Sequence, residues 1–63
     1  MTPDYVILKY FAYSHLPEHL QEISKHFSDL AEKMAKQGKD AQETAAGLRK
    51  LLEAKDCAVR SFL

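Results

Sequence analysis

The chain has 63 residues, with nine basic and nine acidic side chains and a formal net charge of zero. This length permits one domain, residues 1–63, whose isolated core is marginal because so small a domain buries only about 60% of its unfolded surface. Charge balance argues against nonspecific DNA or RNA binding, which depends on a basic excess. The single cysteine, Cys57, excludes an internal disulfide, and we expect it to be a small buried residue.

The first expected element is a short helix over residues 3–13. Thr2, Pro3 and Asp4 form a helix-start signal. The β-branched and aromatic residues that follow favour a strand by themselves, but the chain offers no second strand to pair with it. The apolar run over residues 5–12 is too short to span a bilayer, and the acidic residue before it is unlike a signal peptide. We therefore expect a soluble, cytoplasmic protein that does not enter membranes.

A long helix is expected over residues 16–37. Pro17 suits its first turn, and Gly38 can take the left-handed conformation that ends a helix. Apolar residues recur at alternating steps of four and three, which places them on one stripe. They are Leu16, Leu20, Ile23, Phe27, Leu30 and Met34.

A second long helix is expected over residues 40–62. Asp40 and Glu43 form a capping signature at its start. Its apolar stripe, interrupted at Lys55, consists of Ala41, Ala45, Leu48, Leu52, Val59 and Phe62, and a second stripe beside it consists of Gly47, Leu51, Ala54 and Ala58. The fold is therefore expected to be all-α, an antiparallel hairpin with a short N-terminal helix. One hairpin cannot cover so broad an apolar face, so we expect a compact symmetric homo-oligomer.

An H-x-x-E-H pattern raises the question of a metal site. It consists of His15, Glu18 and His19, with Glu22 and His26 nearby. A zinc hydrolase also needs a third ligand and a water-excluding cleft, for which this chain offers little material. No nucleophile stands beside an orienting base in the sequence. We expect polar-face and capping roles for these residues, no metal or cofactor, and no enzyme activity.

Aromatic residues gather near the N-terminus and suggest a binding surface. Tyr10 and Tyr13 can stack on nucleobases while a cation meets a phosphate, whereas Phe11 is favoured as a packing anchor. The candidate cations are Lys25 and Arg60. For either cation alone, a solvated role is the more common one.

Two blocks of sequence resemble a family of small phage proteins that act as cyclic-oligonucleotide sponges against the bacterial CBASS defence. The first block runs through residues 10–21, with Ser24-Lys25 and residues 30–32 after it, and the second runs through residues 48–60. The resemblance covers nearly the whole chain. Between the blocks, many relatives have a longer connection, whereas this chain turns at residues 37–39.

The resemblance implies a homohexamer that binds cyclic dinucleotides such as cyclic GMP-AMP between protomers and leaves them uncleaved. It implies that Tyr10 stacks on a base, or Tyr13 if the first helix is rotated, and that Lys25 contacts a phosphate. It further implies separate pockets for cyclic trinucleotides, where Arg60 faces a phosphate. Phe27 and Phe11 stand at ligand-facing positions where relatives differ. The ligand would be sequestered in the host cytoplasm during infection.

A different class of function also fits the residues. The broad apolar stripe could capture a helix of a host protein, which would make the chain a protein–protein adaptor. The sponge predicts intact bound nucleotide, and the adaptor predicts no response to nucleotides.

Overall fold

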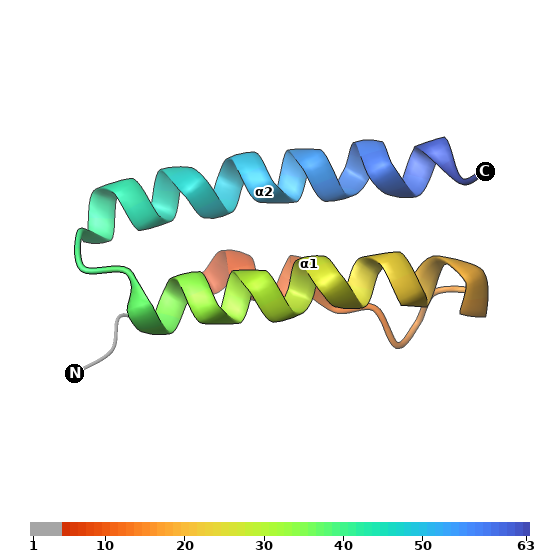
Figure 1. Ribbon diagram of the computed structural model, residues 1–63, viewed down its shortest axis with the longest axis horizontal. Helices are drawn as coiled ribbons and strands as arrows, with labels where there is room; N and C mark the ends of the chain where they lie inside the picture. The colour runs from red at the N-terminus through yellow and green to blue at the C-terminus, as the bar shows by residue number, and fades with distance from the viewer. Residues whose placement is uncertain (1–4) are drawn as a thin grey trace.

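The computed structural model describes residues 5–63 as a hairpin of two long helices with a short helix packed against it (Figure 1). The 3₁₀-helix η1 spans Val6–Phe11, and the α-helices α1 and α2 span Glu18–Gln37 and Ala41–Ser61. No strand occurs within residues 5–63, which confirms the all-α class. The two long helices run antiparallel, and η1 lies behind them in Figure 1 and contacts both.

The first two helices begin later than the sequence pattern predicts. η1 starts at Val6, and residues 3 and 4 of the expected first helix lie outside the described part of the chain. In α1, Pro17 takes the position before the first helical residue, and its carbonyl accepts the backbone N–H groups of Leu20 and Gln21 at 2.9 and 3.0 Å. The Gln21 amide Nε2 also donates to the Leu16 carbonyl at 2.7 Å, which holds the loop against the first turn.

The turn between α1 and α2 is held by glycine packing and by an acidic cap. Gly38 has φ −66° and ψ 129°, so the left-handed conformation expected there is wrong, although the helix does end at this glycine. Asp40 caps α2 as predicted, with its Oδ1 accepting the Glu43 backbone N–H at 3.0 Å. Thr44 Oγ1 donates to the Asp40 carbonyl at 2.7 Å.

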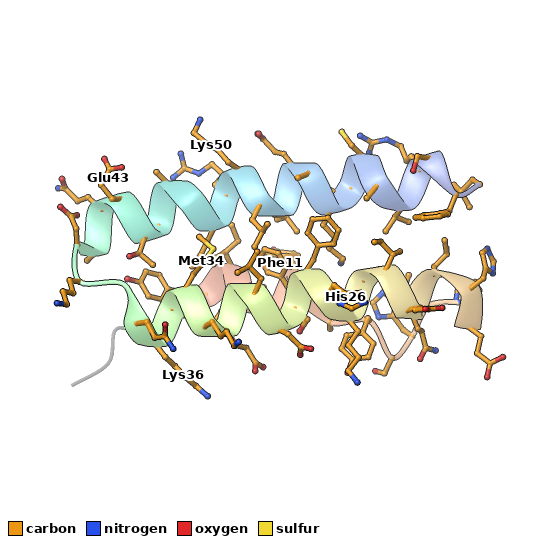
Figure 2. The ribbon with its side chains drawn as sticks, in the orientation of Figure 1. Phe11, His26, Met34, Lys36, Glu43 and Lys50 are labelled. Carbon is orange, nitrogen blue, oxygen red and sulfur yellow. The ribbon has the colours of Figure 1, made fainter. Side chains whose placement is uncertain are left out.

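The core lies where η1, α1 and α2 meet. Phe11, Ala31 and Leu48 are fully buried and contribute one residue from each helix. Phe11 is labelled in Figure 2. Half-buried apolar side chains from all three helices pack around them, including Phe27 and Met34. The short helix is therefore part of the hydrophobic core.

The buried side of α1 is displaced from the predicted apolar stripe. Its buried residues are Leu20, Ser24, Ala31 and Ala35. Leu30, predicted on the stripe, is 48% exposed. Small side chains at the buried positions let η1 and α2 approach α1 closely, which turns Leu30 outward.

The buried side of α2 contains polar residues. Thr44, Leu48 and Lys55 are its buried positions. Cys57 is exposed, so its expected burial is wrong for this chain. It comes two residues after Lys55, which places it about 200° around the helix and away from the core.

No helix within residues 5–63 combines the length and apolar character needed to cross a membrane.

The two glycines provide a matched test of the packing. A Cβ at Gly38 would collide with Thr44 Oγ1 and lie 2.8 Å from the Met34 carbonyl oxygen, whereas one at Gly47 would meet only the flexible Met34 Cε, at 2.9 Å. We expect Gly38→Ala to lower the free energy of unfolding by about 1–3 kcal/mol. Gly47→Ala should leave it unchanged or raise it by up to about 1 kcal/mol, because alanine favours a helix. Urea denaturation followed by circular dichroism measures both, and a Gly38→Ala protein as stable as Gly47→Ala would contradict this packing.

Candidate aromatic and cationic site

Tyr10 presents the exposed aromatic surface of η1. Its side chain is 57% exposed, whereas the next residue, Phe11, is 1% exposed. The Lys9 ammonium lies 5.1 Å from the centroid of the Tyr10 ring, a cation–π contact. Tyr10 therefore combines an accessible ring with an adjacent positive charge.

Lys55 links the Tyr10 backbone to α2. Its Nζ donates to the Tyr10 carbonyl oxygen at 2.8 Å, although the two residues are 45 positions apart in the sequence. Lys55 is 7% exposed, and its charge-assisted hydrogen bond to the exposed Tyr10 is partly buried. Such a bond fixes the carboxyl end of η1 relative to the hairpin.

Lys25 is exposed on α1, on the side that faces the loop after η1. It follows Gln21 by four residues and therefore lies on the same side of the helix. Gln21 contacts that loop through the Leu16 carbonyl. Lys25 is thus exposed to solvent, one helical turn after the residue that contacts the loop.

Arg60 is exposed near the end of α2. Its Nη2 lies 3.4 Å from the Cys57 Sγ, one turn earlier on the same helix. Tyr10, Lys25 and Arg60 thus come from three different helices, and no hydrogen bond joins them within residues 5–63.

The other aromatic candidates are less accessible than Tyr10. Phe11 is fully buried and Phe27 packs on the same core cluster. Tyr13 is half-buried in the loop after η1. Within one chain, Tyr10 is therefore the aromatic candidate with the most accessible ring.

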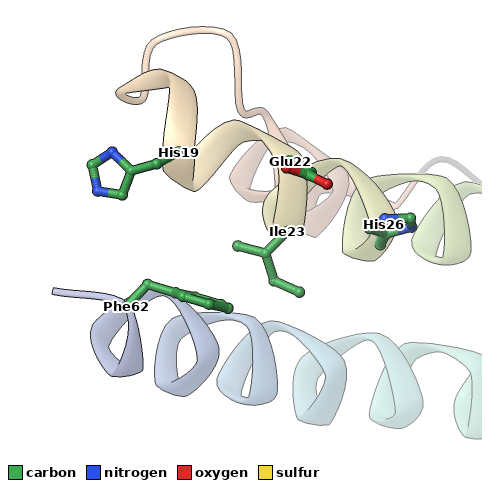
Figure 3. Close-up of a pocket in the computed structure, with 5 residues that line it drawn as sticks. All are labelled: His19, Glu22, Ile23, His26 and Phe62. Carbon is green, nitrogen blue, oxygen red and sulfur yellow. The ribbon is translucent and has the colours of Figure 1, made fainter.

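An apolar surface remains uncovered on the side of the hairpin away from η1. We define it as the open face, formed by Ile23, Phe27, Leu30 and Phe62. A hollow of about 260 Å³ is lined by Ile23, Phe27 and Leu30 together with His26, and a second of about 260 Å³ joins Ile23 to Phe62 across the two helices (Figure 3). The short helix lies behind the hairpin in Figure 1, whereas His26 projects from its front in Figure 2.

Two of the three histidines, His19 and His26, lie at the edge of the open face. His19, Glu22 and His26 border the hollow shared with Phe62. No group of three His, Cys, Asp or Glu side chains within residues 5–63 is arranged to hold a metal ion. The H-x-x-E-H pattern therefore has no assembled ligand set in the described chain.

Two lysines at this site were not among the candidate binding residues identified from the sequence. Lys9 lies inside the aromatic run, where it interrupts the apolar pattern. Lys55 interrupts the apolar stripe of α2, and the structure explains this interruption by its bond to Tyr10. The sequence signal that could have identified both lysines is a single charged residue at an otherwise apolar position of a helix.

Comparison of the chain with known protein-family models, with curated proteins and with solved structures finds no match.

Adjacent aromatic residues should differ sharply in their effect on stability. We expect Phe11→Ala to lower the free energy of unfolding by about 3–5 kcal/mol, because it empties the contact between the three helices. Tyr10→Ala should change it by no more than about 0.5 kcal/mol, because the ring is mostly exposed. Urea denaturation at one protein concentration compares the two, and equal losses would show that Tyr10 is a core residue.

Proposed function

We propose that this protein binds and sequesters cyclic dinucleotides such as cyclic GMP-AMP without cleaving them, as a phage counter-defence protein in the host cytoplasm. The observation that carries the proposal is the exposed Tyr10 ring with the Lys9 ammonium beside it on a helix anchored to the core. The resemblance to cyclic-oligonucleotide sponges supports the choice of ligand.

The chemistry of a cyclic dinucleotide suits these residues. Each of its two bases offers a face that can stack on an aromatic ring, and each of its two phosphates carries one negative charge. Tyr10 supplies the ring, and Lys25 supplies a cation on the flank of α1 nearest the loop after η1. A symmetric pair of protomers would provide two rings and two lysines, which matches the ligand without giving the chain a basic net charge.

Self-assembly into a symmetric oligomer, a hexamer by the resemblance, is part of the proposal. The buried apolar residues of the described chain are few, and two are alanines: Phe11, Leu20, Ala31, Ala35 and Leu48. Meanwhile the open face exposes large apolar side chains. A second copy is the occupant we propose for it, because a net charge of zero gives no overall repulsion between copies.

The neighbouring surface of α2 suits close helix packing. Gly47 approaches Met34 of α1, and the residues at helical spacing after it are Leu51, Ala54 and Ala58. Small side chains let the backbone of another helix come near. Leu51 packs on the core cluster and Gly47 lies against Met34, so Ala54 and Ala58 are the members of this stripe that a second copy would approach.

A second class of pocket, for cyclic trinucleotides, would use Arg60. Its guanidinium is exposed and can move from Cys57 to a phosphate. Phe11 is fully buried, so contact between its ring and such a ligand would require the core to open. The proposed trinucleotide site therefore rests on Arg60.

Isothermal titration calorimetry with cyclic GMP-AMP tests the proposed function. We expect Tyr10→Ala and Lys25→Ala each to weaken binding by about tenfold or more. Stacking on one base contributes about 1–3 kcal/mol, and a hydrogen bond between charged groups contributes about 1.5–3 kcal/mol. Lys36→Ala is the matched control, because Lys36 is an exposed lysine near the other end of α1 that points away from α2 (Figure 2). Chromatography of the released ligand should recover it intact.

Two outcomes would overturn this function. Turnover of the ligand would make the protein a hydrolase, and a chelator would then show whether it depends on a metal. Absence of binding by any cyclic di- or trinucleotide, in folded and assembled protein, would favour the adaptor, since the open face also fits an amphipathic helix of another protein.

Sedimentation velocity tests the proposed assembly. Leu30→Glu places a charge on the open face and should shift the protein toward monomer, because an unpaired buried carboxylate is costly. Val6→Glu also replaces an exposed aliphatic side chain by a carboxylate, but on η1, so the oligomer should persist. An oligomer unaffected by Leu30→Glu would show that the open face is not the interface.

A further inference from the structure

We infer that Lys55 is a positioning residue for Tyr10: its ammonium group holds the carboxyl end of η1 so that the exposed ring is presented in one orientation. The role of that ring in ligand binding rests on the proposed function. The hydrogen bond itself is a feature of the structure and can be tested separately.

The need for an anchor follows from the hydrogen bonding of η1. A 3₁₀-helix of six residues is a weak unit, and its last carbonyls have no partner within the helix. At the carboxyl end, the Ala12 N–H reaches the Lys9 carbonyl at 3.4 Å, a long bond. The next carbonyl, that of Tyr10, receives the Lys55 ammonium at 2.8 Å. The shorter bond at this end of η1 is therefore supplied by α2.

The Tyr10 ring cannot be fixed by packing alone. More than half of its surface is exposed, and its cation–π contact is with Lys9, which is also exposed. Phe11 anchors the opposite side of the same turn in the core. Together, Phe11 and Lys55 restrain the peptide group that follows Tyr10, which reduces the freedom that a stacking ligand would have to remove.

A buried lysine is not the side chain that stability alone would favour here. Removing an ammonium from water is unfavourable, and an apolar residue of similar length can often replace a buried charge without loss of stability. Lys55→Met keeps the length of the side chain and removes the hydrogen-bond donor. It should therefore separate positioning of Tyr10 from stability of the fold.

Fluorescence can follow Tyr10 directly, because the chain contains three tyrosines and no tryptophan. Tyr5→Phe and Tyr13→Phe leave Tyr10 as the single emitter, and the Tyr5 hydroxyl has no hydrogen-bond partner within residues 5–63 to lose. In this background, time-resolved anisotropy measures the local motion of the Tyr10 ring without any ligand. Affinity for cyclic GMP-AMP is measured in proteins that retain all three tyrosines.

We expect Lys55→Met to keep the melting temperature within a few degrees of the parent protein, to increase the local motion of Tyr10, and to weaken cyclic GMP-AMP binding at least fivefold. Lys50→Met is the control, because Lys50 is exposed and points away from α1 in Figure 2, and it should change none of these quantities. Lys55→Arg, which restores a charged donor, should recover part of the restraint on Tyr10.

Unchanged Tyr10 motion in Lys55→Met would overturn the inference, whatever the ligand does. Unchanged affinity together with increased motion would also overturn it, because the orientation of the ring would then not matter for binding. If the parent protein binds no cyclic nucleotide, the proposed function fails, and the anisotropy alone decides whether Lys55 holds Tyr10. Should Lys55→Met fail to fold, Lys55→Leu also removes the donor while keeping an apolar side chain at this position, and the same outcomes decide the inference.

Discussion

The contact of Phe11 with Ala31 and Leu48 is the constraint on which the rest of the fold depends. One ring from a six-residue helix reaches between two long helices, and the small side chain of Ala31 leaves space for it. Because a 3₁₀-helix of this length has little stability alone, its position is determined by this burial. Everything that η1 presents to solvent, including Tyr10, is therefore placed by the core.

Docking of η1 also divides the hairpin into two unlike sides. The side toward η1 contributes to a core that Phe11 completes, whereas the side with Leu30 stays uncovered. A chain of this size has no further helix to place there within residues 5–63. The same packing that fixes Tyr10 thus leaves an apolar surface for a partner, so the proposed ligand site and the proposed assembly have one structural origin.

The sequence predicts the parts of this structure that depend on residues close to one another along the chain. Apolar periodicity gives both long helices, and Asp40 gives the start of the second. The burial of Ser24 and Lys55 could not be predicted in the same way, because each depends on where η1 docks, and η1 comes from a segment whose composition also favours a strand. Among the site candidates, the exposure of Tyr10 and the burial of Phe11 follow from the same docking of η1. They could not be predicted from apolar periodicity, because a six-residue helix is too short to show one.

Lys55 shows how a departure from the apolar pattern can carry information about function. An apolar side chain at this position could fill the same space in the core, but it could not donate to the Tyr10 carbonyl. A lysine that is 7% exposed, at a position where an apolar residue would also be buried, indicates that the residue type is set by something other than burial. Because its hydrogen bond ends at the residue with the most accessible aromatic ring, orientation of that ring is the requirement that best accounts for a lysine at this point of the core.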